Sequence, residues 1–215
     1  MRKLFGYFRS SAAFRVRIAL NLKGLEYDHA FVHLTKNGGE QFAPEYRQLN
    51  PQALVPVLQE DDVALTQSLA IVEFLDETYP EPAFLPKSIA ARARVRSLAL
   101  MVACEIHPLN NLRVLRYLVN DLKLSEEQKN QWYRHWVLTG LEPLESHLAN
   151  DKATGEFCHG DTPGLADICL VPQLANARRF NIELDAFPTL VRIETNCAGL
   201  KAFQDAAPGV QPDAE

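Results

Sequence analysis

Two neighbouring serines, Ser10 and Ser11, lie where an apolar run ends and a helical pattern begins. Neither is followed three residues later by Glu or Gln, so no capping box satisfies the first amides of the expected helix. Free N–H groups and the positive end of a helix dipole favour an anion there, such as the thiolate of a thiol with an ordinary pKa of about 8.5. The dipole contributes only about 0.3–1 kcal/mol, so a hydroxyl hydrogen bond has to contribute as well. Taken alone, the pair is more simply explained as an ordinary helix cap.

A second candidate is the Val55–Pro56 pair, which begins a run typical of a strand. Proline cannot donate a hydrogen bond to a β-ladder. A cis-proline ahead of the strand would resolve this and leave the Val55 backbone free to pair with an extended peptide ligand. A simple edge-strand proline explains the sequence equally well.

A third candidate is Gln67 with Ser68, at the start of another helical pattern. An amide and a hydroxyl at a helix amino terminus can hold a carboxylate with the help of the dipole. The simpler explanation is that Ser68 is the amino-terminal cap.

A fourth motif, Gly160–Ile168, opens an almost wholly apolar helical segment. Asp167 lies in the first turn of that segment, where it would accept hydrogen bonds from otherwise unpaired amides. This motif therefore indicates structure rather than catalysis.

The elements that position these groups alternate between strand and helix patterns over the first 80 residues. Apolar residues recurring every fourth position predict an amphipathic helix, and an acidic turn at 60–62 predicts a hairpin. The resulting order, βαβ followed by ββα, is that of a thioredoxin-like α/β domain. The expected strands are residues 3–8, 25–34, 55–59 and 63–66, and the expected helices are residues 12–23 and 68–79.

Prolines between positions 80 and 87 predict a linker, and the patterns beyond it are helical. The chain is therefore expected to contain a thioredoxin-like domain, residues 1–82, and an all-α domain, residues 88–215. The tail Gln211–Glu215 is expected to be loose. The expected helices of the second domain are 92–118 (one helix, or two joined near Pro108), 132–148 and a buried central helix at 166–177.

Composition excludes several classes of protein. The chain has 215 residues, of which 47% are hydrophobic and 23% charged, with a formal net charge of -5. Such a chain is expected to be soluble, and general nucleic-acid or anionic-membrane binding is disfavoured because both need a basic face. No apolar run approaches the roughly 20 residues of a membrane span.

The cysteines are scattered, without CxxC or metal-ligand spacing, so neither a metal site nor a disulfide scaffold is expected. Cys104 and Cys169 lie in apolar helical patterns and are expected to be buried thiols, which suits a reducing cytosol. Basic residues dominate before Glu26, as in some mitochondrial transit peptides. A strand joined directly to a patterned helix favours a basic face toward an anionic ligand instead.

Together these motifs resemble the glutathione transferase superfamily over essentially residues 3–213. Ser10-Ser11 followed by Arg-Val-Arg-Ile-Ala-Leu at 15–20 resembles its zeta class, the maleylacetoacetate and maleylpyruvate isomerases. The resemblance implies the glutathione transferase fold, with a thioredoxin-like domain followed by a helical one. Further zeta-like stretches are Gly38–Phe42, Leu49–Pro51, Leu170–Gln173, Asn176–Phe180 and Gln211–Asp213.

The resemblance also implies roles for individual residues. Ser10 and Ser11 would stabilise the glutathione thiolate, with slightly more weight on Ser10. Val55 would pair with the cysteinyl backbone of glutathione, and Gln67 with Ser68 would hold its γ-glutamyl end. Tyr7 more simply packs or assists, because the serine pair follows it. The other implied glutathione contacts are Arg15, Gln41, Pro56, His107 and Asn111, and the implied substrate contacts are Arg9, Arg113 and Arg179.

Two positions depart from the zeta pattern: Ala12 replaces a cysteine and Phe14 replaces a tryptophan. The missing cysteine weakens an assignment to maleylacetoacetate, because relatives that isomerise maleylpyruvate also lack it. Those relatives carry an arginine cluster at positions matching Arg9, Arg113 and Arg179.

The implied activity is glutathione-dependent isomerisation of maleylacetoacetate to fumarylacetoacetate, in tyrosine and other aromatic catabolism. The alternatives are maleylpyruvate isomerisation and a general glutathione transferase or dehalogenase. A non-catalytic binding module is least favoured, because such modules tend to lose the activating hydroxyl. The resemblance further implies a cytoplasmic homodimer.

Overall fold

The chain forms two compact units in the computed structural model, which describes residues 2–215. One unit combines the described part of Met1–Phe84 with Ala198–Glu215, and the other is Leu85–Cys197. The segment from Ala198 onward thus groups with the sheet, whereas the sequence analysis places it in the helical domain.

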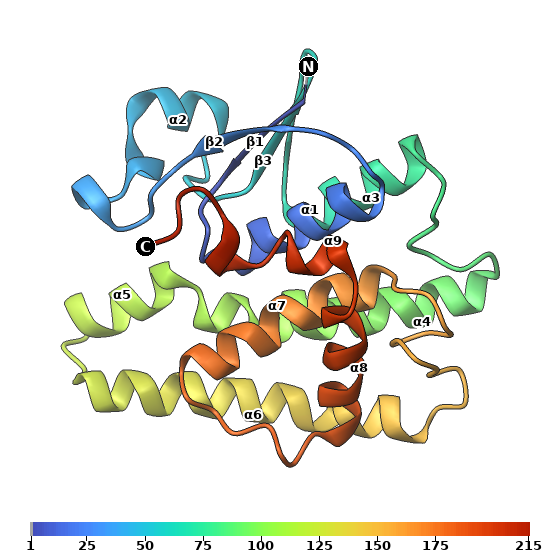
Figure 1. The fold of residues 1–215 in the computed structure, drawn as a ribbon. Coiled ribbons are helices and arrows are strands. Elements are labelled where there is room, and N and C mark those ends of the chain that lie inside the picture. Colours follow the sequence, from blue (N-terminus) through green and yellow to red (C-terminus); the bar gives the residue numbers. More distant parts are fainter. Residues whose placement is uncertain (1) are drawn as a thin grey trace. The chain divides into compact units, whose positions relative to one another are not determined.

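The first unit contains a four-stranded mixed sheet in the order β2-β1-β3-β4 (Figure 1). β1 is parallel to β2 and antiparallel to β3, and β3 forms a hairpin with β4. β2 is shorter than predicted because it is an edge strand that pairs only with the short β1. The strands are β1 (Arg2–Gly6), β2 (Asp28–Phe31), β3 (Val57–Glu60) and β4 (Val63–Thr66).

Helices cover both faces of this sheet. Figure 1 shows α1 and α3 on one face and α2 on the other. Alternation along the strands explains this arrangement, since Val57 joins a core cluster with Val32 and Tyr46 of the α2 side, while its neighbour Leu58 is buried on the opposite face. This unit is the expected thioredoxin-like βαβ-ββα domain. Its helices are α1 (Ser11–Leu22), α2 (Pro44–Leu49), α3 (Ser68–Thr78) and the short α9 (Lys201–Gln204).

The second unit is built mainly of helices, with an irregular segment between α6 and α7. The predicted segment 92–118 is two helices, α4 (Ile89–Leu100) and α5 (Leu112–Asn120), joined near Pro108. A π-helical turn, Met101–Ile106, and a short 3-10 turn lie between them. The further helices, in chain order, are α6 (Glu126–Asn150), α7 (Leu165–Arg179) and α8 (Pro188–Ala198).

The predicted role of Asp167 in α7 is confirmed. Its carboxylate accepts hydrogen bonds from the N–H groups of Cys158 at 2.8 Å and Gly164 at 2.9 Å. Burial raises the pKa of this carboxyl, and the backbone hydrogen bonds oppose that shift. The side chain therefore organises the start of the buried central helix.

Two further predictions about the fold are wrong, one in each unit. Cys104 is exposed, although Cys169 is buried as expected. Cys104 lies in the π-helical turn, where a 3.6-residue pattern no longer tells which side chains face inward. The tail is not loose: Gln211 is 6% exposed, and its side-chain amide donates to the carbonyls of Asp205 and Ala207 at 2.8 and 2.9 Å.

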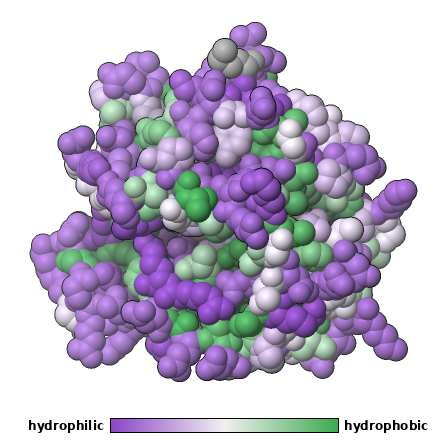
Figure 2. All heavy atoms as spheres, viewed as in Figure 1, coloured by the Kyte–Doolittle hydropathy of each residue, from purple (hydrophilic) through white to green (hydrophobic). Residues whose placement is uncertain are grey.

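The surface agrees with the composition. On the face drawn in Figure 2, hydrophilic residues cover most of the area and hydrophobic residues are scattered among them. Over residues 2–215, no helix has the length and apolar character that crossing a membrane requires.

Candidate functional site

The junction of β1 with α1 places both predicted serines at the amino end of a buried helix. Ser10 is the cap residue, with an extended backbone, and its Oγ accepts a hydrogen bond from the Ala13 N–H at 3.2 Å. Ser11 is the first helical residue and is 4% exposed. The first turn contains no acidic side chain to neutralise the positive end of the dipole.

The Ser10 hydroxyl can donate a hydrogen bond while it caps the helix. A serine hydroxyl has one hydrogen to donate besides its acceptor lone pairs. Ser10 uses an acceptor position for Ala13, so its O–H hydrogen can still be donated to an anion. The cap and the thiolate-binding interpretations of the pair are therefore compatible.

Aromatic side chains and one arginine lie next to this junction and contact one another. Tyr7 is 6% exposed, and its ring lies 4.7 Å from the Phe8 ring and 4.8 Å from the His33 ring. Arg9 is exposed, with its guanidinium 4.8 Å from the Phe8 ring centroid. Tyr7 thus contributes packing, while Arg9 presents its charge to solvent.

The start of α3 differs from the prediction in one respect. The cap position is Gln67, not Ser68, and Ser68 is the first helical residue. Gln67 has a φ of 68°, a conformation that costs a non-glycine residue about 1–3 kcal/mol and is concentrated at ligand sites. Its amide donates to the Gln52 Oε1 at 2.9 Å rather than capping the helix.

Ser68 is held by a residue from the other helix. The Nη1 of Arg15 donates to the Ser68 Oγ at 3.3 Å, and both residues are buried. This contact brings together the amino-terminal halves of α1 and α3, the two helix starts that sequence analysis singled out. The Val55–Pro56 bond just before β3 is cis, which is one of the two alternatives that the sequence left open.

Gln41 is the remaining predicted residue of this unit, and it is 4% exposed. It lies in a 3-10 turn after Gly39, whose φ of 109° favours glycine. A Cβ on Gly39 would lie 2.8 Å from the Gln41 Nε2, so the turn packs directly on this amide. Among residues 2–215, no hydrogen-bond partner reaches the Gln41 Oε1.

The other predicted residues belong to the helical unit. His107 follows the π-helical turn, and its N–H donates to the Val102 carbonyl at 3.0 Å. Asn111 caps α5, with its Oδ1 accepting from the Arg113 N–H at 3.1 Å. The Arg113 side chain is exposed. That these residues share one site with Ser10 stays a prediction.

Arg179 ends α7 beside an aromatic pair that sequence analysis did not identify. The rings of Tyr133 and Phe180 stack with centroids 3.7 Å apart, and the Arg179 guanidinium lies 4.8 Å from the Phe180 ring. Burial raises the pKa of Tyr133 to about 12, while the charge of Arg179 and a hydrogen bond with it oppose the shift. No spacing rule links positions 133 and 179, so this support could not be found in the sequence.

Across residues 2–215, the His, Cys, Asp and Glu side chains form no group of three that could hold a metal ion. All four cysteines are free thiols, and burial raises the pKa of Cys158 and Cys197.

Comparison with known proteins gives the family. The model of the glutathione S-transferase N-terminal domain matches residues 9–78. A probable maleylacetoacetate isomerase of Vibrio cholerae is 51% identical over 98% of this chain and 97% of its own. A maleylpyruvate isomerase of Ralstonia is 45% identical over 98% of this chain and 99% of its own.

Solved structures similar to this chain belong to the same family as its relatives in sequence. A holo structure of maleylpyruvate isomerase, a bacterial zeta-class glutathione S-transferase, superposes with a TM-score of 0.96 at 45% identity, covering 99% and 100% of the two chains. A maleylacetoacetate isomerase from Anaeromyxobacter dehalogenans, with glutathione in its active site, gives 0.89 at 44% identity over 100% and 98%. The chain therefore belongs to the glutathione S-transferase family and, within it, to the zeta-class group of maleylacetoacetate and maleylpyruvate isomerases.

Proposed function

We propose that this protein isomerises maleylacetoacetate to fumarylacetoacetate, with glutathione as cofactor. The observation that carries the proposal is the β1–α1 junction, where Ser10 and Ser11 meet an un-neutralised helix start in a chain related over its full length to such isomerases. Residues 1–82 bind glutathione, and the helices of 88–215 provide the wall of the substrate site.

The residues present suit glutathione. Leaving a buried polar atom without a hydrogen bond costs about 1–3 kcal/mol, and the Oε1 of Gln41 is such an atom within residues 2–215. A ligand amide would satisfy it. Gln67 and Ser68 at the α3 start, with Arg15 hydrogen-bonded to Ser68, suit the α-carboxylate of the γ-glutamyl end, since the first turn of that helix has no acidic residue either. Val55 and Pro56 would bind the cysteinyl backbone, and His107 and Asn111 would complete the contacts.

When bound, glutathione supplies a thiolate that adds reversibly to a conjugated cis double bond, which permits rotation and elimination to the trans product. Ser10 would donate its hydroxyl hydrogen to the bound sulfur, and Ser11 and the first amides of α1 would add to the positive potential there. The three arginines, Arg9, Arg113 and Arg179, hold the substrate's carboxylates, because guanidinium groups stay charged and bind carboxylates in a bidentate manner.

Maleylpyruvate is the second candidate substrate. Ala12 favours it, because this position lacks the cysteine that the zeta pattern carries in maleylacetoacetate isomerases. The same three arginines would serve either cis-diketo acid. A general transferase or dehalogenase activity would use the same thiolate on other electrophiles. The protein acts in the cytoplasm as a homodimer, in aromatic amino acid degradation.

The test compares kcat/KM for maleylacetoacetate, maleylpyruvate and an aryl halide at saturating glutathione. The proposal predicts the highest value for maleylacetoacetate. A higher value for maleylpyruvate would assign the second substrate, and conjugation of the aryl halide without isomerisation of either diketo acid would overturn the isomerase proposal.

A further inference from the structure

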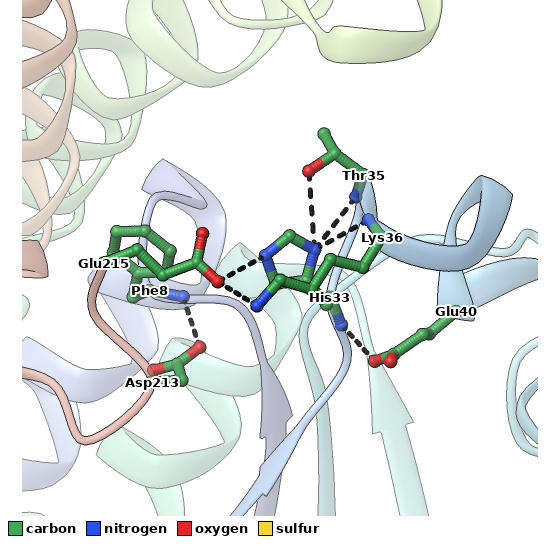
Figure 3. Close-up of polar contacts among 7 residues, drawn as sticks. All are labelled: Phe8, His33, Thr35, Lys36, Glu40, Asp213 and Glu215. Carbon is green, nitrogen blue, oxygen red and sulfur yellow. Dashed lines mark hydrogen bonds and ion pairs between the residues drawn. The ribbon is translucent and has the colours of Figure 1, made fainter.

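The backbone of Phe8, two residues before Ser10, is held from both sides by charged groups. The carboxylate of Asp213, in the carboxyl-terminal tail, accepts a hydrogen bond from the Phe8 N–H at 3.0 Å (Figure 3). The Nη2 of Arg17, in α1, donates to the Phe8 carbonyl at 3.0 Å. Hydrogen bonds with an ionised partner are roughly twice as strong as neutral ones, so the turn that contains Phe8 is firmly fixed.

Arg17 is itself immobilised. It is 3% exposed, and its Nε donates to the Ala206 carbonyl at 2.9 Å. Burial lowers the pKa of Arg17 to about 10, an effect opposed by Tyr27 and Asp213, so the guanidinium remains charged at neutral pH. Arg17 therefore links α1, the turn after β1 and the chain just before the tail.

The tail presents Asp213 from a fixed position. On its amino-terminal side, the buried Gln211 donates to two backbone carbonyls. On its carboxyl-terminal side, Glu215 forms an ion pair with Lys36 and lies 3.4 Å from the Nε2 of His33 (Figure 3). The imidazole is oriented in turn, since its Nδ1 accepts from the Lys36 N–H at 2.9 Å.

The turn that follows Phe8 carries the groups assigned to the reaction. The Ser10 N–H donates to the Tyr7 carbonyl at 2.9 Å, which closes a turn around Phe8 and Arg9. A shift of Phe8 would therefore move the Ser10 hydroxyl and the Arg9 side chain together. Misplacement of reacting groups by about 1 Å can cost about 100-fold in rate.

We infer that Asp213 and Arg17 are positioning residues for the isomerase, which fix the turn from Tyr7 to Ser10 from both sides of the Phe8 backbone. The inference rests on the proposed function of Ser10. It gives a role to the Gln211–Asp213 stretch, whose Asp213 carboxylate accepts the hydrogen bond from Phe8.

The test replaces Asp213 in the full-length protein. Asp213→Ala is expected to lower kcat about 10- to 100-fold, with a smaller change in the KM for substrate. It should also raise the pKa of the bound glutathione thiol, measured by ultraviolet titration of the complex. Asp213→Asn keeps an acceptor oxygen and should restore most of kcat. Asp205→Ala removes an exposed carboxylate of the same region, paired with Lys201, and should leave kcat unchanged.

A purely structural role would give a different pattern. A lower melting temperature for Asp213→Ala with the kcat and thiol pKa of the unchanged protein would overturn the inference. If Asp213→Ala does not fold, Asp213→Glu is the substitute, because it displaces the carboxylate by one methylene. It should lower kcat, and a wild-type kcat for Asp213→Glu would contradict the inference.

A backbone measurement separates this inference from the proposed function. Hydrogen exchange of the segment containing Phe8 should be faster in Asp213→Ala than in Asp205→Ala, whether or not the protein isomerises a diketo acid. Equal exchange in the two variants would overturn the positioning role. Absent isomerase activity in the unchanged protein, with the exchange difference present, would overturn only the proposed function.

Discussion

The Oγ of Ser10 accepts a hydrogen bond from the Ala13 N–H at 3.2 Å, and Ser88 makes the same contact with Ala91 at 3.2 Å at the start of α4. Ser10 and Ser88 are thus serine caps with the same cap distance, and of these two only Ser10 is assigned to glutathione. Comparing these two serines therefore separates the contribution of the Ser10 hydroxyl to protein stability from its contribution to catalysis.

Ser10→Ala and Ser88→Ala should each lower the free energy of unfolding by about 1 kcal/mol, because each removes one helix cap. Only Ser10→Ala should reduce kcat, by about 100-fold, since of the two serines only Ser10 is assigned to stabilise the glutathione thiolate. Denaturant unfolding and steady-state kinetics of both variants check this. Equal kcat values in the two variants would remove Ser10 from the mechanism.

Arg179→Ala should raise the KM for the diketo acid about 10- to 100-fold, because hydrogen bonds to a charged group contribute about 1.5–3 kcal/mol. Its neighbour provides a matched control. Arg178 pairs with Glu194 at 2.6 Å on the surface, so Arg178→Ala should leave KM unchanged. Initial rates at varied substrate and saturating glutathione give both values. A similar KM for the two variants would contradict the assignment of Arg179.

Gly140→Ala should destabilise the helical unit by about 1–3 kcal/mol. A Cβ at this position of α6 would lie 2.2 Å from the Cγ1 of Ile106, which is fully buried in the π-helical turn before His107. The overpacking outweighs the gain in helix propensity of about 1 kcal/mol from glycine to alanine. Gly209→Ala, which meets nothing within 4 Å, is the control for thermal unfolding. Unchanged or increased stability of the Gly140 variant would show that the Ile106 side chain moves to make room for the added methyl group.

Protonation of the Glu60 carboxylate should lower the free energy of unfolding in acid. Its carboxylate receives hydrogen bonds from Arg2 at 2.7 and 2.5 Å and from the Tyr79 hydroxyl at 2.7 Å, and the Arg2 contact holds its pKa below the ordinary value of 4.5. Because the folded-state pKa is depressed, the stabilisation is complete above about pH 4.5 and is lost as the pH falls through the folded-state value.

Glu60→Gln should therefore be less stable than the unchanged protein at neutral pH, and the difference should shrink below about pH 4.5. Urea unfolding at a series of pH values measures the difference. A constant difference from about pH 7 to about pH 3 would mean that the Arg2–Glu60 pair does not govern this titration.

Most of the fold could be predicted from local patterns. The apolar stripe of α1, the acidic hairpin turn between β3 and β4 and the Asp167 motif of α7 each depend on residues close in sequence, and each is present in the structure. The order of these elements was enough to indicate the thioredoxin-like sheet, because that order restricts the possible topologies.

The parts that the sequence could not predict depend on contacts between distant residues. Asp213 meets the Phe8 N–H across 205 positions, and composition alone made the tail appear loose. In the candidate site, Ser68 and Arg15 were both named, but the hydrogen bond between them was not predicted, because a contact between two helices leaves no periodic signal. Cys104 was misplaced because a π-helical turn changes the periodicity.

The most direct test of the central claim is the rate at which the purified protein isomerises maleylacetoacetate, followed optically under three conditions. The conditions are no added thiol, added glutathione, and added S-methylglutathione, which has the same peptide but no free thiol. The account predicts turnover with glutathione alone. Equal rates without glutathione or with S-methylglutathione would contradict a thiolate mechanism at Ser10, as would the absence of turnover from folded protein that binds glutathione.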